Sequence, residues 1–466
     1  MNFPEDTIAA ISTPSGIGGI SVIRISGKDA INKADTIFHG KRPLSMVKTH
    51  TAHFGKIMFN DGTTIDEVVA TVFKEPHSYT AENLVEISCH GGYYVTKMLL
   101  ENILATGIRH ATPGEFTKRA FLNKRIDLVQ AEAVAEMINS TSTLYHRAAT
   151  AQLEGKLSSE IEQIRGRLLS LSSLLEIELD FAEEGVELQN RTILKSEIST
   201  TISILEKWID SYKIGKIYKD GIKVAIVGKP NVGKSSIFNA LLCEERSIVT
   251  EMPGTTRDFI EENLAIGGIL FNISDTAGVR ESVDLAESRG IERTNLQIRT
   301  SDVVILVLDP TQQITEADNK IISLIMKKEE NGNNKRILIF NKYDIVKPNQ
   351  HMVEQVKLFS PHVINLSAKT NYGLNDLRKT MISTTLGHTS ADLQHSVTII
   401  NERHKECIVK AKNNLINANN AIINSMSNEY VSFDIHSAMK ELGEIIGVYS
   451  SEELLNTIFS KFCIGK

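Results

Sequence analysis

The order of apolar and polar positions changes along the chain, and each change predicts a different kind of structure. Residues 1 to about 120 contain short runs rich in β-branched residues between glycines and prolines, and Ile20–Ile25 and Val68–Phe73 are predicted strands. From about residue 128 to 212, apolar residues recur at the three- and four-residue spacing of a helix. One stripe of them predicts a helix-packing face: Leu153, Leu157, Ile161, Ile164, Leu168, Leu171 and Leu175.

Between Gly221 and about Gly387, short apolar runs alternate with segments long enough for a helix. This alternation is typical of a parallel sheet with helices on both faces. The helical period returns after about residue 388 and continues almost to the end. Two helical stretches on either side of an α/β segment predict one helical domain interrupted by an inserted domain. The predicted strands of the α/β segment are Ile222–Val227, Leu270–Ser274, Val303–Leu308, Ile337–Phe340 and Val363–Leu366.

Composition and charge describe an ordinary globular protein. The chain has 466 residues, 41% hydrophobic and 23% charged, and 51 Lys and Arg against 57 Asp and Glu give a net charge of −6. These values exclude a disordered chain, a collagen-like chain and a small disulfide-bonded scaffold. The negative charge also argues against a protein that coats nucleic acid through bulk charge.

The ends of the sequence and its cysteines predict a cytoplasmic protein. Acidic residues stand near the N-terminus where a signal peptide carries Lys or Arg. The best apolar run, Val303–Leu308, is far shorter than the roughly 18 residues of a membrane span. The four cysteines form no CxxC pair, so a zinc site or a disulfide framework is not expected: Cys89, Cys243, Cys407 and Cys463.

The strongest motif is the stretch Gly228–Ser235, which reads GKPNVGKS and lies between a predicted strand and a predicted helix. This is the pattern of a phosphate-binding P loop. Its glycines let backbone N–H groups surround phosphates, Lys234 reaches the outer phosphates, and the Ser235 hydroxyl binds Mg²⁺. The context of strand, loop and helix makes an accidental match improbable.

Four further motifs follow in the order that a guanine-nucleotide site requires. A threonine of Thr255–Asp258 can ligate Mg²⁺, and Asp275–Gly278 can reach the metal and the γ-phosphate. In Asn341–Asp344 a carboxylate can accept hydrogen bonds from two groups that guanine has and adenine lacks. Ser367–Lys369 can close over the base. The predicted GTP-binding residues are Asn231, Val232, Gly233, Lys234, Ser235, Ser236, Thr250, Thr255, Thr256, Asp275, Thr276, Ala277, Gly278, Asn341, Lys342, Asp344, Ser367, Ala368 and Lys369.

This set resembles the translation-factor class of GTPases over about Ile222 to Leu386. Where Ras-like enzymes carry a glutamine that positions water, this chain has Val279, which cannot do so. Another group must therefore assist hydrolysis. The candidates are a monovalent cation near Asn231 and one of three carboxylates in the following segment: Glu281, Asp284 and Glu287.

The whole chain resembles the MnmE (TrmE) family of tRNA-modifying GTPases. The resemblance includes the terminal sequence Cys463–Lys466 and the segments Leu442–Gly447 and Leu454–Phe459. In the N-terminal third it is carried by Asp6–Ala10, Arg24–Gly27, Ser78–Thr80, Cys89–Gly92, Pro113–Phe116 and Arg119–Asn123.

The resemblance implies a fold of three parts and two kinds of bound cofactor. It implies an α/β multidomain chain: an N-terminal α+β folate-binding and dimerisation domain (1–120), a discontinuous helical domain (121–216 plus 388–466) and a Ras-like G domain (217–387). The N-terminal domain of the family binds 5-formyl- or methylene-tetrahydrofolate, through positions that match Arg24, Glu86, Arg125 and Lys466. Three positions depart from the family, which commonly has Arg at Ile17 and Thr112 and Lys at Arg125.

The resemblance also implies ions and catalytic residues. Ser235 and Thr256 match the Mg²⁺ ligands, and the K⁺ site of the family maps to Asn231, Thr250, Met252 and Thr255. The acid that activates water maps to Glu287. Cys463 matches the terminal cysteine of the family, and its role as nucleophile, redox partner or positioning group stays open.

The implied activity is the addition of an aminomethyl or carboxymethylaminomethyl group at C5 of the wobble uridine of tRNA. The family acts as a homodimer with an FAD-dependent partner, MnmG (GidA), and couples K⁺-dependent GTP hydrolysis to dimerisation of G domains. The alternative is a regulatory or ribosome-assembly GTPase that modifies nothing. It is disfavoured because a switch needs neither the folate-like segment nor Cys463. Two basic clusters are interpreted as solvated helix surface: Lys213, Lys216 and Lys219, and Arg403, His404, Lys405, Lys410 and Lys412.

Overall fold

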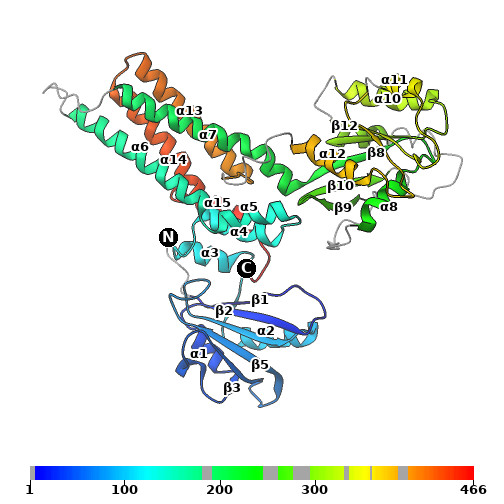
Figure 1. Ribbon diagram of the computed structural model, residues 1–466. Coiled ribbons are helices and arrows are strands. Elements are labelled where there is room, and N and C mark those ends of the chain that lie inside the picture. Colours follow the sequence, from blue (N-terminus) through cyan, green and yellow to red (C-terminus); the bar gives the residue numbers. More distant parts are fainter. Residues whose placement is uncertain are drawn as a thin grey trace. The chain divides into compact units, whose positions relative to one another are not determined.

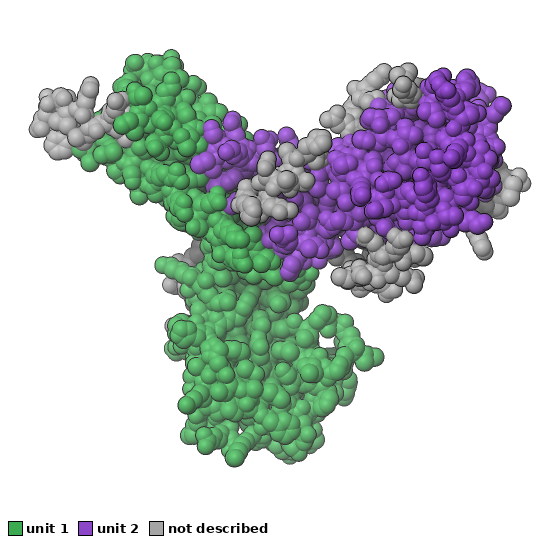
Figure 2. Space-filling model, viewed as in Figure 1, with its two compact units in different colours: residues 1–139, 150–202, 407–466 green, residues 140–149, 203–406 purple. Residues whose placement is uncertain are grey.

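The computed structural model describes residues 6–180, 191–244, 261–275, 294–329, 335–356, 359–386 and 397–466. The chain forms two compact units, coloured separately in Figure 2. Unit 1 comprises residues 1–139, 150–202 and 407–466, and unit 2 comprises residues 140–149 and 203–406. The division into three domains made from the sequence stays a prediction.

Unit 1 contains a seven-stranded sheet in the order β3-β4-β5-β6-β2-β1-β7 (Figure 1). Neighbouring strands are antiparallel except for the β1–β7 pair, which is parallel. Both strands predicted in this region are confirmed, and β5 begins four residues before its predicted start. The strands are β1 (Ile8–Ile11), β2 (Ile20–Ser26), β3 (Phe38–Gly40), β4 (Thr51–Met58), β5 (Thr64–Phe73), β6 (Leu84–His90) and β7 (Arg109–His110).

Helices α1 (Ala30–Asp35) and α2 (Tyr93–Ala105) cover one face of this sheet, with a short 3₁₀ turn at Leu44–Met46. Their apolar side chains join those of β2, β5 and β6 in one core, in which Ile23, Val85 and Leu99 are fully buried. The other face carries a smaller cluster in which Phe116 packs on Ile8 and Ala10 of β1. The sheet is therefore buried on both faces near β1 and β2.

The other regular elements described in unit 1 are helices. Helices α6 and α14 pack along each other, and α15 packs on α4 through Leu128, Leu455 and Phe459. Parts of α5, α7 and α13 belong to unit 2. The bounds are α3 (Glu115–Leu122), α4 (Leu128–Ile138), α5 (Thr143–Leu153), α6 (Lys156–Asp180), α7 (Arg191–Asp220), α13 (Glu402–Ile423), α14 (Asn428–Ile446) and α15 (Glu452–Phe459).

The predicted apolar stripe is confirmed over most of its length. Six of its seven residues, from Leu157 to Leu175, lie on α6 and are buried. Leu153 is the exception, because it is the last residue of α5. The backbone at Gly155 has a φ of +80°, which glycine adopts without a steric penalty and which separates the two helices.

Unit 2 contains a six-stranded sheet in the order β13-β12-β11-β8-β10-β9. The five predicted strands are parallel, as predicted, and a sixth strand that the sequence did not predict, β9, pairs antiparallel with β10. The reason is the turn at Gly267 and Gly268, whose positive φ angles allow a two-residue hairpin. The strands are β8 (Ile222–Val227), β9 (Glu261–Ile266), β10 (Ile269–Asp275), β11 (Val303–Leu308), β12 (Lys335–Phe340) and β13 (Val363–Asn365).

Helices cover both faces of this second sheet, as the sequence predicts. One apolar cluster joins the strands to α8 (Lys234–Glu244) and α12 (Leu374–Leu386). The other joins alternate strand residues to the helix at residues 294–300, α10 (Glu316–Glu329) and α11 (Gln350–Val356). All six residues of β11 are buried, as expected for the centre of such a sheet. No helix in the described ranges is long and apolar enough to cross a membrane.

A network of ion pairs around the buried Arg119 and Glu115 joins the start of β1 to α3 in unit 1. Arg119 is 5% exposed and makes ion pairs with Asp6, Glu82 and Glu115. Arg109 pairs with Asp6 and with Glu115 at 2.6 Å each. Burial alone would raise the pKa of the Glu115 carboxyl, but hydrogen bonds from Arg109, the Thr112 backbone and Arg119 outweigh it and lower that pKa to about 2.

The low pKa of Glu115 predicts acid sensitivity. A carboxyl with a pKa of about 2 when folded and an ordinary value of 4.5 when unfolded stabilises the fold above pH 4.5. This stabilisation is lost as the pH falls from about 4.5 towards 2. Glu115→Gln is expected to flatten the pH dependence of the free energy of unfolding in that range. Urea unfolding at a series of pH values measures it. Glu154→Gln, which removes an exposed carboxylate, should keep the wild-type slope, and equal slopes for wild type and Glu115→Gln would contradict the prediction.

Candidate nucleotide-binding site and a second polar site

The first candidate site lies where β8 ends and α8 begins. The loop between them has left-handed backbone at Asn231 and Gly233, with φ of +64° and +99°. A Cβ on Gly233 would lie 2.1 Å from Nδ2 of Asn341, so this position has no room for a side chain. The sequence motif is thus required by a close approach between two loops.

Lys234 begins α8 and is 8% exposed. Its Nζ donates hydrogen bonds to the carbonyl oxygens of Gly228 at 2.9 Å and Lys229 at 2.8 Å. These bonds hold the ammonium group across the loop. The N-terminus of α8 and this ammonium group together create the positive potential that phosphates bind.

Asn341 connects three loops at the edge of the sheet where β8, β12 and β13 end. It follows β12 and is 3% exposed. Its Nδ2 donates to the carbonyl of Val232 at 2.8 Å, and its Oδ1 accepts from the backbone N–H of Ala368 at 3.2 Å. The side-chain amide of Asn341, in the loop after β12, therefore links this loop to the P loop and to the loop after β13.

Asp344 is oriented by the loop that follows β13. The Ser367 hydroxyl donates to Oδ1 of Asp344 at 2.6 Å and accepts from the backbone N–H of Thr370. Tyr343 stacks on Tyr372 with ring centroids 5.3 Å apart, which fixes the same two loops on the outside. One oxygen of Asp344 is thus held by protein, and the other can accept hydrogen bonds from a ligand.

These loops enclose a cavity of about 560 Å³. Ten of its twelve lining residues are among the predicted GTP-binding residues. The other two are Pro230, which lies inside the P-loop motif, and Ile345, which directly follows Asp344. Val232 and Ser367 are buried and act on the cavity through Asn341 and Asp344. The lining residues are Pro230, Asn231, Gly233, Lys234, Ser235, Ser236, Asn341, Lys342, Asp344, Ile345, Ala368 and Lys369.

Other predicted nucleotide residues are only partly placed. Asp275 ends β10 and pairs in register with Ile226 of β8, so its backbone lies beside the strand that leads into the P loop. The rest lie outside the described residues: Thr250, Met252, Thr255, Thr256, Thr276, Ala277, Gly278 and Glu287.

The second candidate site lies on the sheet of unit 1 and contains three of the four predicted folate residues. Arg24 and Glu86 are register partners on β2 and β6, and Nη2 of Arg24 lies 2.7 Å from Oε1 of Glu86. The Arg24 guanidinium also lies over the rings of Tyr79 and Phe116. Burial, and then the charge of Arg24, lower the pKa of Lys466, against opposing effects of Glu86 and Cys463. We call Arg24, Glu86, Tyr79 and Lys466 the Arg24 site.

The C-terminal residues bind between β1 and α3. The Lys466 carbonyl accepts a hydrogen bond from the N–H of Phe116, and the Gly465 carbonyl accepts one from the Ser12 hydroxyl. Gly465 has a φ of +91°, and a Cβ there would lie 2.2 Å from the Ile11 carbonyl oxygen. This fit places Lys466 at the Arg24 site, while Cys463 is exposed.

The positions that depart from the family pattern have different surroundings. Arg125 donates to the Tyr79 carbonyl and stacks on the Tyr79 ring, at 5.1 Å from its centroid, so that both Arg24 and Arg125 contact this ring. Thr112 donates to Glu115 through its N–H and hydroxyl. Ile17 is fully exposed.

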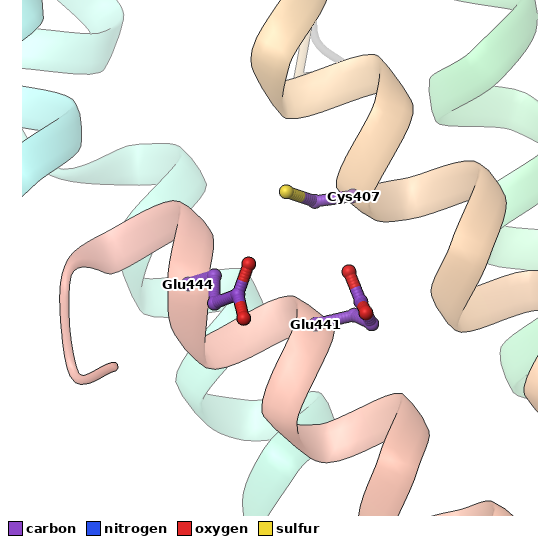
Figure 3. A group of neighbouring side chains, drawn as sticks. All are labelled: Cys407, Glu441 and Glu444. Carbon is purple, nitrogen blue, oxygen red and sulfur yellow. The ribbon is translucent and has the colours of Figure 1, made fainter. Parts of the chain in front are cut away.

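A third group contains potential metal ligands. Among the described residues, Cys407 of α13 and Glu441 and Glu444 of α14 have ligand atoms within 4.8 Å of one another (Figure 3). Lys410 lies one turn from Cys407, and its Nζ is 3.8 Å from Glu441. The lysine supplies an opposite charge to these carboxylates, and we assign no metal to the group.

Most residues of the two basic clusters lie at the surface, as predicted, but the prediction for His404 is wrong. Lys213 and Lys410 are exposed and pair with acidic neighbours. His404 was also interpreted as solvated surface, but its side chain is completely buried. Because it faces the helix-packing side of α13, it contributes nothing to a basic surface.

The first site has the parts of a G domain: a P loop, a lysine aimed at phosphates and an asparagine–aspartate loop suited to guanine. This arrangement defines the chain as a GTP-binding protein of the P-loop class. Residues 7–125 match the family model "GTP-binding protein TrmE N-terminus", and residues 128–463 match "MnmE helical domain".

Two curated relatives are named "tRNA modification GTPase MnmE". The one from Flavobacterium johnsoniae is 40% identical over 99% of both chains, and the one from Acetivibrio thermocellus is 41% identical over the whole of both. The chain therefore belongs to the MnmE family of tRNA modification GTPases, and the predicted fold class and family are confirmed. A partial match to the solved G domain of the T. maritima FeoB iron transporter has 27% identity, covers 35% of this chain and 98% of that one, and has a TM-score of 0.26. The assignment rests on the full-length relatives.

The close approach at Gly233 predicts that a single methyl group impairs nucleotide binding. Gly233→Ala places a Cβ against the Asn341 amide at a left-handed backbone position, so the affinity for GDP should fall by about tenfold or more. Titration with a fluorescent GDP analogue measures this. Gly166→Ala, with no atom within 4 Å of its new Cβ, is the matched control and should bind as wild type does. Equal affinity of the Gly233→Ala protein would show that the two loops can separate.

Proposed function

We propose that this GTPase is the GTP-hydrolysing subunit of a complex that modifies C5 of the wobble uridine in tRNA. The added group is aminomethyl or carboxymethylaminomethyl, and a tetrahydrofolate supplies its one-carbon unit. The observation that carries the proposal is the convergence of Arg24, Glu86 and Lys466 beside an exposed Cys463. A regulatory switch that only binds GTP has no use for such a second site.

The Arg24 site fits 5-formyl- or methylene-tetrahydrofolate in charge and in its aromatic surface. Nη1 of Arg24 is buried without a hydrogen-bond partner, which is costly unless a ligand accepts from it. Tyr79 offers an aromatic face, while Arg24 and Lys466 offer positive charge to a carboxylate-bearing ligand. In this proposal Arg24 and Lys466 bind and orient the folate, Arg125 contributes through its contact with Tyr79, and Cys463 takes part in the modification.

GTP binds in the cavity of unit 2. Lys234 and the backbone N–H groups of the P loop bind the phosphates, and Asp344 accepts hydrogen bonds from guanine. We propose Mg²⁺ at Ser235 and Thr256, and Glu287 as the group that activates water. We further propose that hydrolysis is coupled to dimerisation of G domains.

Potassium dependence is the most direct test of the proposed hydrolysis mechanism. A K⁺ ion bound through Asn231, Thr250, Met252 and Thr255 would add positive charge beside the β- and γ-phosphates and stabilise the transition state. GTP hydrolysis should therefore be about tenfold or more faster in KCl than in NaCl at matched ionic strength. Phosphate release in the two salts measures the ratio, and equal rates would overturn the K⁺ proposal.

The proposed partners are a second copy of the chain, the FAD-dependent MnmG (GidA), and tRNA, in the cytoplasm. Exposed apolar side chains at the start of β2 and at the start of α2 in unit 1 support a homodimer through this region. Ile17, Ile20, Tyr93 and Tyr94 are each at least 69% exposed, and the Gly18–Gly91 hydrogen bond brings their two segments together. Such a group of exposed apolar residues is typical of an interface between proteins. With a net charge of −6, tRNA binding is expected to depend on the partner as well.

The modification itself is tested by mass analysis of tRNA nucleosides. Cells without this gene should lack C5-substituted wobble uridines, and the wild-type gene should restore them. Arg24→Gln and Cys463→Ser should fail to restore them, because the first removes the buried guanidinium and the second the thiol. Lys97→Gln, a change at an exposed cation of α2, is the control and should restore them fully. An unchanged nucleoside profile in cells without the gene would overturn the modification function and leave a GTP-binding switch.

A further inference from the structure

The segment from the end of β11 to the first turn of α10 contacts both nucleotide loops and contains two buried carboxylates that no sequence motif includes. Asp309 directly follows β11, and Asp318 lies in the first turn of α10. Each side chain is 2% exposed, and each makes a close ion pair with a lysine of a nucleotide loop. Buried charges are costly unless they are paired and hydrogen-bonded, so both pairs require an explanation.

Asp309 fixes Lys342 of the loop that follows β12. Nζ of Lys342 donates to Oδ2 of Asp309 at 2.6 Å. The other oxygen accepts from the N–H and hydroxyl of Thr311 at 2.9 Å and 2.6 Å, so the carboxylate cannot rotate freely. Burial would raise the pKa of Asp309, but the bonds from Lys342 and Thr311 outweigh it and lower that pKa. Lys342 has a left-handed backbone and lines the cavity between Asn341 and Asp344.

Asp318 fixes Lys229 of the P loop. Nζ of Lys229 lies 2.6 Å from Oδ2 of Asp318 and donates to the Thr315 hydroxyl at 3.1 Å. The same Oδ2 accepts from the N–H and hydroxyl of Thr315, which holds the carboxylate at the start of α10. Lys229 does not line the cavity, but its backbone carbonyl accepts from Nζ of Lys234. The position of the phosphate-binding ammonium therefore depends on the Lys229 backbone.

We propose that Asp309 and Asp318 are positioning residues, and that each holds the lysine of a different nucleotide loop in place, Lys342 and Lys229 respectively. Asp309 acts through Lys342 on the guanine half of the GTP site, and Asp318 acts through Lys229 and Lys234 on the phosphate half. The inference rests on GTP binding in the cavity of unit 2. The two carboxylates shape the site before a nucleotide enters, so less side-chain freedom is lost on binding.

The proposal predicts different losses for the two aspartates. Asp309→Asn should weaken GDP binding roughly 5- to 30-fold and reduce the preference for GDP over IDP, which lacks the 2-amino group that Asp344 recognises. Asp318→Asn should weaken GDP binding by a similar factor but reduce the preference for GDP over GMP instead. Each variant should leave the other preference unchanged. Competition against a fluorescent GDP analogue measures all the affinities.

Controls separate positioning from general damage. Glu316→Gln changes an exposed carboxylate of the same segment and should bind as wild type does. In a Lys342→Met background, Asp309→Asn should have little further effect on the GDP to IDP ratio, because its action passes through that lysine. Thermal unfolding identifies any variant that fails to fold, and Asp309→Glu and Asp318→Glu then serve as the milder changes.

The outcomes distinguish this inference from the proposed function. If wild type prefers GDP over ADP but both nucleotide ratios stay unchanged in the aspartate variants, the positioning role is wrong and the GTP site stands. Equal reduction of both ratios in both variants would also overturn it, since that indicates general loosening. A wild type without preference for GDP over ADP would overturn the guanine-nucleotide site itself.

Discussion

The nucleotide site depends on the side-chain amide of Asn341, which donates to the P loop and accepts from the loop after β13. The amide is buried, so water cannot replace either partner, and each unmade bond would cost about 1–3 kcal/mol. The absence of a side chain at Gly233 follows from the space that this amide occupies. Because parallel strands end at the same edge of the sheet, loops that are far apart in sequence reach one amide.

The Arg24 site is organised by a different constraint. Its ion pair is set by strand register, since Arg24 and Glu86 are opposite each other on β2 and β6. Its last member, Lys466, is held by the close fit of Gly465 against β1 and by the hydrogen bond from the Phe116 N–H to the Lys466 carbonyl. The described residues of each site belong to one unit. A GTPase of the MnmE family thus combines two sites whose local geometries have independent origins.

The sequence predicted the elements whose signals are local. The P loop is one contiguous motif, and the strands before it and at Val303–Leu308 were predicted to the residue because buried parallel strands are continuous apolar runs. The antiparallel strand β9 was missed although Gly267 and Gly268 signal a hairpin. Leu153 was assigned to the wrong helix because periodicity alone does not register the break at Gly155.

Side-chain partners far along the chain could not be predicted in this way. Asp309 and Asp318 belong to no motif, and the lysines they bind are placed beside them only when the sheet forms. The burial of His404 likewise depends on what packs against α13. Its neighbours in the sequence are basic, and for this reason His404 was predicted to be on the surface. Tyr79 lies in a segment that resembles the family but had no predicted role, and the structure places its ring in contact with two arginines.

The composition of unit 2 has a consequence for the order of folding. Residues 140–149 belong to this unit, and the Leu144 N–H donates to the Gly268 carbonyl at the β9–β10 turn. Gly215 of α7 packs closely on the backbone of Ile399, which follows the sheet in the sequence. During synthesis on the ribosome, residues 140–149 therefore emerge well before the strands of the sheet, and the segment that contains Ile399 emerges after them. Unit 2 can therefore complete its folding only late in synthesis. Until the β9–β10 turn has been synthesised, the start of α5 lacks the backbone contact that it makes there.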